Sequence, residues 1–323
     1  MGDGVPAIDV RGLRKVYRNT VAVDGIDLRV ERGEIFALLG PNGAGKTTTV
    51  EILEGYRRRD AGAVTVLGVD PAVATGGSGR PPARWRQLRA AGDPDARRWR
   101  ERIGIVLQGT GEFDELEVGE VVRHFARFYP APDDPAGVIA RVGLSDKVKA
   151  RTHSLSGGQK RRLDVALGIV GRPELLFLDE PTTGFDPEAR REFWGLIRDL
   201  QDSGTTILLT THYLEEAEAL ADRVGVITRG RLIAVDTPRM LGNRDTALAT
   251  VSWRTPEGAW ERKQSATPTA VVAELAARFD GEVPGLTVTR PTLEDVYVEM
   301  IGMTERTERS EGREGRQEIG TAT

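Results

Sequence analysis

The stretch that most constrains this chain is residues 40–47, with the sequence GPNGAGKT. It matches the phosphate-binding pattern G-x-x-x-x-G-K-[ST] at every fixed position. The apolar run 35–39 before it is typical of a buried strand, and the run 48–53 after it contains no helix breaker. A glycine-rich loop between strand and helix lets backbone N–H groups surround an anion at the positive end of the helix. A chance glycine turn is the alternative, and the flanking strand and helix argue against it.

Two side chains of this loop have specific expected roles. Lys46 would reach the β- and γ-phosphates of a nucleotide, and the hydroxyl of Thr47 would ligate Mg²⁺. The other residues expected to contact the nucleotide from this loop are Gly40, Pro41, Asn42, Gly43, Ala44, Gly45 and Thr48. The expected ligand is therefore a nucleotide with its magnesium ion.

The composition excludes several other classes of protein. The chain has 323 residues, enough for one large domain or two ordinary ones, and its net charge of −4 gives no basic excess for binding nucleic acid. The absence of cysteine excludes disulfides, a thiol nucleophile and cysteine metal sites. Three scattered histidines do not predict a zinc site. No apolar run approaches the length of a membrane span, so we expect a protein of the cytosol.

Polar side chains follow three further strand-like runs. Gln108 follows 103–107, the pair Asp179 and Glu180 ends 175–180, and His212 follows 205–211. Carboxyl ends of strands in an open α/β sheet face the ligand crevice. We expect Asp179 on the metal side and Glu180 polarising the attacking water. The alternatives are an acid pair that caps the next turn and a structural strand-end histidine.

A second glycine-containing stretch, residues 155–159, opens a helix. Ser156 is a good N-cap, and Gly157, Gly158 and Gln159 follow it, so this helix start is a second anion site. One nucleotide rarely needs two γ-phosphate sites. A dimer, in which this site closes on the nucleotide held by the other subunit, reconciles them. Asp186 is the expected N-cap of the next helix, with a proline at its first position.

The N-terminal part predicts two antiparallel strands, 8–16 and 21–30, beside the phosphate-loop strand. Tyr17, which follows the first, either stacks on an adenine ring or packs on the core. Residues 75–100 are rich in Gly, Ser, Pro and Arg and predict an inserted surface loop. That loop is either a solvated insertion or a contact for an anionic partner such as lipid headgroups.

The last third of the chain predicts a small accessory domain followed by a tail. Runs 246–253, 269–279 and 285–289 are typical of strand, helix and strand, and 292–301 of an amphipathic helix. Residues 304–323 carry no apolar periodicity and predict a disordered tail. We therefore expect domains at 1–239 and 240–303, with the tail at 304–323.

These motifs occur in the order of the ATP-binding cassette (ABC) ATPases, which the chain resembles over about 8–236. The correspondences are Tyr17 in the adenine-stacking position, 40–48 as Walker A, Gln108 as the Q-loop, 155–159 as the signature, 175–180 as Walker B, Asp186 as the D-loop acid and His212 as the switch histidine. The D-loop has Phe185 where the family more often has leucine. Residues 292–297, TLEDVY, look like the C-terminal motif of the daunorubicin-resistance-type ATPases that serve ABC-2-type exporters.

The resemblance implies an α/β fold: a P-loop (RecA-like) core, an antiparallel β subdomain, a helical signature subdomain and a C-terminal α+β accessory domain. It implies that two copies sandwich two ATP molecules, with Thr47, Gln108 and Asp179 serving Mg²⁺ and His212 holding the γ-phosphate. The expected partner is an ABC-2-type permease on a separate chain, and the expected location is the cytoplasmic face of the cell membrane. The expected cargo is a drug or another hydrophobic compound.

Other uses of such a cassette fit this chain less well. Soluble ABC proteins that act on ribosomes usually carry two cassettes in one chain, and here the motifs occur once. A DNA-repair cassette needs a long coiled-coil insertion, which the sequence lacks. A sensor that does not hydrolyse ATP would be expected to lose Glu180. The alternative kept open is a soluble, non-transport ABC ATPase.

Overall fold

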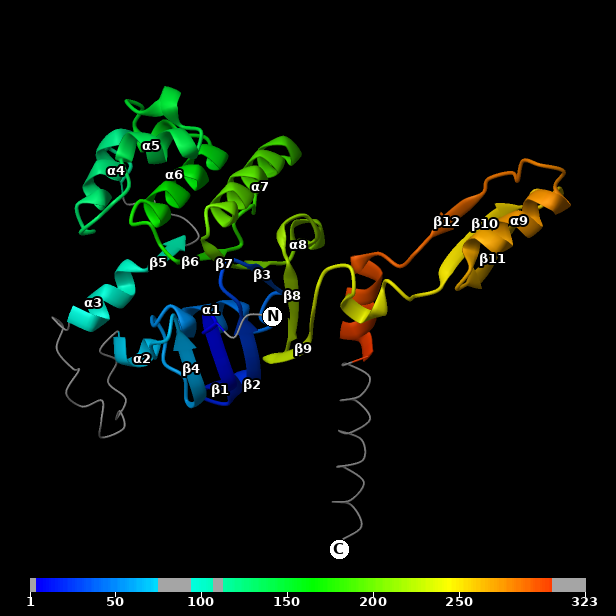
Figure 1. The fold of residues 1–323 in the computed structure, drawn as a ribbon, viewed down its shortest axis with the longest axis horizontal. Helices are drawn as coiled ribbons and strands as arrows, with labels where there is room; N and C mark the ends of the chain where they lie inside the picture. The colour runs from blue at the N-terminus through cyan, green and yellow to red at the C-terminus, as the bar shows by residue number, and fades with distance from the viewer. Residues whose placement is uncertain (1–3, 75–93, 107–112, 304–323) are drawn as a thin grey trace, which may run out of the picture. The chain divides into compact units, whose positions relative to one another are not determined.

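The computed structural model describes residues 4–74, 94–106 and 113–303 (Figure 1). The chain divides into two compact units, 1–235 and 236–323, where the sequence predicted a boundary after residue 239. Each unit has its own core and is described by itself. The predicted tail, 304–323, lies outside the described residues.

The first unit is built on a six-stranded sheet in the order β5-β6-β7-β3-β8-β9. Its strands are β3 (Ile35–Leu39), β5 (Ile103–Val106), β6 (Leu175–Asp179), β7 (Thr206–Thr211), β8 (Arg223–Thr228) and β9 (Arg231–Asp236). The five strands β5-β6-β7-β3-β8 each run parallel to the neighbour with which they pair. All residues of β3 and β7 are buried, which explains why both are continuous apolar or threonine runs without alternation.

The register of this sheet brings the predicted polar positions to one edge. Asp179 at the end of β6 pairs with Thr210 of β7, and Leu39 at the end of β3 pairs with Thr211. The three strands therefore end level with one another. The phosphate loop after Leu39 and the acids after β6 consequently leave the sheet on the same side.

A second, antiparallel sheet has the order β2-β1-β4. It consists of β1 (Ile8–Tyr17), β2 (Thr20–Val30) and β4 (Ala61–Val66). The first two strands pair antiparallel as the sequence predicts, but β4 joins β1, so the three make a sheet separate from that of β3. Apolar side chains of both sheets share one core cluster, which contains Leu13, Phe36 and Leu53.

The helices of the first unit are α1 (Lys46–Leu53), α2 (Pro71–Ala74), α3 (Pro94–Glu101), α4 (Val118–Ala126), α5 (Pro135–Arg141), α6 (Gly157–Ile169), α7 (Pro187–Asp202) and α8 (Leu214–Leu220). Helices α4, α5 and α6 pack on one another as a helical subdomain (Figure 1). Helix α4 begins where Glu117 and Glu120 form a reciprocal capping box.

The predicted surface loop at 75–100 is wrong for its last part, because Pro94–Glu101 is helix α3. Trp99 is buried at 1% exposure and its indole N–H donates to the backbone oxygen of Val66 at 2.9 Å. Arg97 pairs with Glu101 one turn away. The arginine content suggested a solvated loop, whereas one tryptophan fixes the segment to the core. Residues 75–93 lie outside the described chain.

The second unit is a three-stranded antiparallel sheet, order β11-β10-β12, with one helix against it. Its elements are β10 (Ala249–Arg254), β11 (Trp260–Ser265), α9 (Pro268–Arg278) and β12 (Thr287–Thr289), followed by a helical stretch at 293–303. Val251, Trp253, Val271 and Leu275 form its core. Strand β11 was not predicted, because its residues, WERKQS, are largely exposed and show no apolar alternation.

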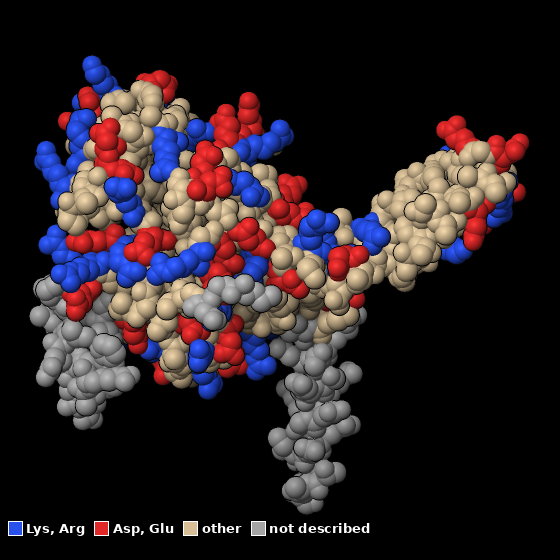
Figure 2. All heavy atoms as spheres, viewed as in Figure 1, with Lys and Arg blue, Asp and Glu red and all other residues tan. Residues whose placement is uncertain are grey.

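The charged surface is mixed. Figure 2 shows Lys and Arg interspersed with Asp and Glu over the visible face of the described residues. Within the described chain, no helix is both long enough and apolar enough to cross a bilayer.

Candidate functional site

The phosphate loop connects β3 to α1 and has the backbone that the motif requires. Gly43 and Gly45 have φ angles of 78° and 107°, in the left-handed region that favours glycine. A Cβ on Gly45 would lie 2.5 Å from the backbone oxygen of Ala22, so no other residue fits there. The turn after β8 braces the loop, since Gly230 N–H donates to Ala44 O at 2.8 Å. The loop is therefore held in shape by its neighbours.

Lys46 is 4% exposed and lies over the loop. Its ammonium donates to Gly40 O at 2.7 Å and Pro41 O at 3.3 Å, and lies 3.6 Å from the Glu180 carboxylate. Burial lowers the pKa of Lys46, while Glu180 and Asp179 act in the opposite direction. A buried lysine bridging the loop and the acid is placed to meet a phosphate that arrives between them.

The acid pair at the end of β6 adopts two different environments. Asp179 accepts a hydrogen bond from the Thr210 hydroxyl, and Glu180 N–H donates to the Thr210 backbone and side-chain oxygens, both at 3.1 Å. Glu180 has φ of +44°, unusual for a residue with a side chain. Strain of this kind persists only where the surroundings over-determine it, and it is common at functional sites.

Three of the predicted catalytic residues, Lys46, Glu180 and His212, meet at the Glu180 carboxylate. The same oxygen, Oε1, lies 3.3 Å from His212 Nδ1 and 3.6 Å from Lys46 Nζ. The side chain is 17% exposed, so solvent still reaches it. His212 stacks on Tyr213 with ring centroids 4.1 Å apart. Lys46 and His212, which are 134 and 32 positions away from Glu180 in the sequence, thus form one cluster with it.

The signature serine caps helix α6 as predicted. Ser156 Oγ accepts from Gln159 N–H at 3.3 Å, and Gln159 Oε1 accepts from Ser156 N–H at 3.0 Å, a reciprocal capping box. Both residues are exposed or half-buried, and Gly157 and Gly158 are open to solvent or nearly so. The helix start is accordingly presented on the surface, where a second subunit can reach it.

Asp186 caps helix α7 and has a pKa below its ordinary value. The cause is hydrogen bonds from the backbone N–H groups of Ala189 and Glu188, at 2.9 and 3.0 Å. Phe185, the departure from the family pattern, packs edge-on against the buried Phe193 with centroids 5.5 Å apart. The phenylalanine thus extends the apolar face of α7, which accounts for its presence before the cap.

Two predicted site residues lie apart from this cluster or outside the description. Tyr17 ends β1, and Lys15 and Arg57 each lie 5.3 Å from its ring centroid. Its adenine-stacking role stays a prediction. Gln108 lies in 107–112, outside the described residues. The strand before it, β5, pairs with β6 in the sheet as expected.

Two residues that hold the acid pair, Arg161 and Thr210, were not predicted from the sequence. Arg161, 7% exposed in α6, donates to the backbone oxygens of Asp179 at 2.7 Å and Pro181 at 3.1 Å. Thr210 contacts both acids, as described above. No local sequence pattern singles out Arg161, whose burial follows from the fold. No sequence signal singles out Thr210 among the four threonines at positions 205, 206, 210 and 211.

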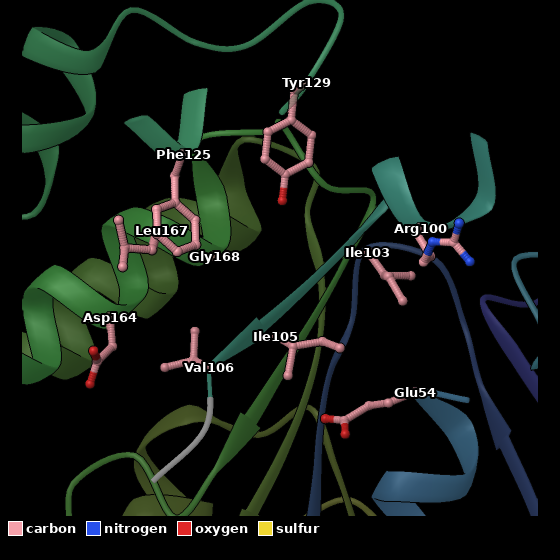
Figure 3. Close-up of a pocket in the computed structure, with 10 residues that line it drawn as sticks. All are labelled: Glu54, Arg100, Ile103, Ile105, Val106, Phe125, Tyr129, Asp164, Leu167 and Gly168. Carbon is pink, nitrogen blue, oxygen red and sulfur yellow. The ribbon is translucent and has the colours of Figure 1, made fainter. Parts of the chain in front are cut away.

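A pocket of about 300 Å³ lies beside β5, with Ile103, Ile105 and Val106 from that strand on one side (Figure 3). Phe125, Tyr129 and Leu167 line it from the helical subdomain. Glu54 reaches the same pocket from the end of α1, is 7% exposed, and has its pKa raised to about 8. Burial is the main cause, followed by the negative charges of Asp179 and Glu51.

Known proteins share both the sequence and the fold. The ABC transporter family profile matches residues 23–183. The Nod factor export ATP-binding protein I of Burkholderia pseudomallei is 36% identical, with 92% of this chain and 98% of that protein covered. The daunorubicin/doxorubicin resistance ATP-binding protein DrrA of Streptomyces peucetius is 42% identical, with 72% of this chain and 65% of that protein covered. The structure of cbiO1 from Clostridium perfringens, part of an ABC transporter complex, superposes with a TM-score of 0.60 at 29% identity. The superposition covers 72% of this chain and 89% of cbiO1.

The phosphate loop, the acid pair and the signature helix on this sheet define a P-loop ATPase. The relative that covers 92% of this chain, together with the family profile, defines the class further: the chain belongs to the ABC transporter family and is one of its ATP-binding, ATP-hydrolysing proteins.

Proposed function

We propose that this chain is the ATPase subunit of an ABC-2-type exporter and drives a permease on a separate chain from the cytoplasmic face of the membrane. The observation that carries the proposal is the extent of similarity to an export ATPase, which spans 92% of this chain and includes the accessory unit. One relative is named for Nod factor export and another for daunorubicin/doxorubicin resistance. A hydrophobic drug or a comparable compound is the proposed cargo.

The proposed hydrolysis uses the cluster around Glu180. Glu180 orients the attacking water and accepts its proton, which its solvent-accessible carboxylate allows. Lys46 and His212, both within 3.6 Å of that carboxylate, hold the γ-phosphate and neutralise its developing charge. The fixed geometry around Thr210 keeps the acid in place during the reaction.

Magnesium fits the donors at this edge. Within the described residues no group of three or more His, Asp or Glu side chains could hold a metal ion. Mg²⁺ usually takes one or two protein oxygens and completes its shell with phosphate oxygens and water. Thr47 and Asp179 would supply those oxygens, with Gln108 as a further ligand by resemblance. Bound Mg²⁺ would neutralise phosphate charge.

The active form we propose is a homodimer. The phosphate loop and the signature helix start are two anion sites on one chain, and Ser156 is presented at the surface. In a head-to-tail pair each ATP would lie between the phosphate loop of one copy and Ser156, Gly157 and Gly158 of the other. Asp186 and Gln159 would contribute to the same interface.

Purification from native membranes tests the transport role. A tagged chain would be recovered from detergent-solubilised membranes, with an equally tagged cytosolic enzyme as the control. We expect a polytopic protein to co-purify with the ATPase and not with the control. Recovery only from the soluble fraction, alone or with ribosomes, would reject the exporter role and leave the ATPase intact.

A further inference from the structure

The accessory unit contains a pocket of about 390 Å³ that no nucleotide-binding motif accounts for. Its lining is Arg239, Arg244, Asp245, Arg290 and Pro291. The volume lies within the range of ligand pockets in proteins. Three of its five lining side chains are guanidinium groups, so the pocket has an excess of positive charge over the single carboxylate.

This concentration of arginine is local. Residues 236–303 contain seven Lys and Arg against ten Asp and Glu, so the unit as a whole is acidic. Three of those seven basic side chains surround this one pocket. Because like charges repel at short range, such clustering in an acidic unit has a cost that an anionic ligand would offset.

Main-chain hydrogen bonds hold two of the arginines in place. Arg244 donates to Pro238 O at 2.6 Å and Pro291 O at 3.3 Å. Arg290 donates through Nη1 to Asp245 O and Ala247 O, at 3.1 and 3.2 Å. Fixing a guanidinium in advance reduces the entropy that is lost when it binds a ligand.

Donors remain for a ligand after these contacts are made. The Nε and Nη2 groups of Arg290 have no hydrogen-bond partner among the described residues, and Arg239 is exposed with no hydrogen bond or ion pair there. Arg244 is partly engaged, because its positive charge acts on Asp295. Hydrogen bonds from Thr292 lower the pKa of Asp295, and the charge of Arg244 lowers it further. The available groups are therefore mainly those of Arg290 and Arg239.

We propose that this pocket binds a phosphate group, with Arg290 and Arg239 donating to its oxygens and Arg244 adding positive charge. The planar fork of arginine matches the oxygen spacing of phosphate and binds it through paired hydrogen bonds. The phosphate belongs either to a free anion or to the headgroup of an anionic phospholipid. Met240 and Leu248, 49% and 47% exposed, adjoin Arg239 and the Ala247 acceptor in sequence and favour the phospholipid. The site is independent of the ATP site and of the transport role.

The first arm of the test measures sedimentation of the full chain with vesicles of phosphatidylcholine alone or with phosphatidylglycerol added. We expect Arg239→Gln and Arg290→Gln each to weaken binding to phosphatidylglycerol vesicles roughly fivefold, the effect of one basic side chain near an anionic surface. Arg262→Gln is the matched control, because Arg262 is an exposed arginine of the same unit, in β11, outside the pocket. ATP turnover without vesicles should be unchanged in Arg239→Gln and Arg262→Gln.

The second arm titrates inorganic phosphate calorimetrically, with the ATP site filled by a non-hydrolysable analogue. Saturable phosphate binding that Arg239→Gln weakens and Arg262→Gln does not, without any preference for phosphatidylglycerol, would identify a free anion as the ligand. A vesicle effect without measurable phosphate binding would identify the lipid headgroup. If Arg239→Gln, Arg290→Gln and Arg262→Gln behave alike in both arms, the proposal is wrong.

Discussion

The guanidinium of Arg161 donates a hydrogen bond to the backbone oxygen of Asp179 at 2.7 Å, and thereby ties helix α6 to the end of strand β6. Its Nε donates to Pro181 O at 3.1 Å, so the two bonds bracket Glu180 on either side. Helix α6 begins at the signature serine. One side chain thus connects the proposed contact with the partner's nucleotide to the backbone that carries Glu180, the proposed general base.

Substituting Arg161 by Gln should damage both stability and turnover. The change leaves two buried carbonyl oxygens without their donors, and each such loss costs about 1–3 kcal/mol. We expect the free energy of unfolding, measured by urea denaturation, to fall by about 2–4 kcal/mol. ATP turnover of the folded fraction should fall at least several-fold, because the turn that holds Glu180 loses its support.

The adjacent arginine provides the control for this prediction. Arg162 pairs with Glu192 on the surface, and exposed pairs contribute about 1 kcal/mol or less. Arg162→Gln should therefore leave turnover near the wild-type rate. Equal losses in the two variants would show that the carbonyl contacts of Arg161 have no special role.

Thr210 is a second residue that holds Asp179 and Glu180 in place. Its hydroxyl is buried at 0% exposure, donates to the Asp179 carboxylate and accepts from Glu180 N–H. Thr210→Val keeps the shape and removes the hydroxyl, so we expect the kcat for ATP to fall about tenfold with a smaller change in KM. Thr210→Ser retains the hydroxyl and should keep most of the activity. A valine variant as active as the serine variant would contradict the role.

The parts of the site that depend on local sequence were predictable. The phosphate loop, the serine cap of α6 and the aspartate cap of α7 each rest on residues close together in the chain, whose backbone preferences are strong. The gathering of Glu180 and His212 was also predictable, because parallel strands must end at a common edge. The order of these motifs along the chain then indicated the family resemblance.

The parts that depend on packing between distant segments were not predictable. Arg161 and Thr210 act on the acids through the fold, and neither belongs to a local pattern. Helix α3 has the composition of a solvated loop, and only the insertion of Trp99 into the core reveals it. Most residues of strand β11 are polar, so its sequence lacks the alternation of apolar and polar residues that would predict a strand.

Glu180→Gln should abolish steady-state ATP hydrolysis while leaving ATP binding intact. The amide cannot accept the proton of the attacking water, and a general base contributes about 10²–10⁴-fold to a rate. With ATP and Mg²⁺ the variant should accumulate as a dimer, observable by light scattering after size exclusion. Glu188→Gln, an exposed acid in the first turn of α7, should hydrolyse ATP normally. Turnover by the Glu180 variant at the wild-type rate would sink the assignment of the base.

Glu54 should make the stability of the protein depend on pH. The raised pKa, about 8 against an ordinary 4.5, means that the folded protein holds a proton that the unfolded chain releases between these values. The free energy of unfolding therefore falls as pH rises from about 4.5 to 8, by up to about 5 kcal/mol from this one group.

Glu54→Gln removes the titration and keeps a neutral side chain of the same size in the pocket. We expect the variant to match the wild type near pH 5 and to exceed its stability by a few kcal/mol near pH 8, measured by urea denaturation at both values. Glu188→Gln is the control, since Glu188 is an exposed acid in the first turn of α7 and does not contribute to the raised pKa of Glu54. A constant difference between wild type and Glu54→Gln across this pH range would show that the buried carboxyl is ionised in the folded protein.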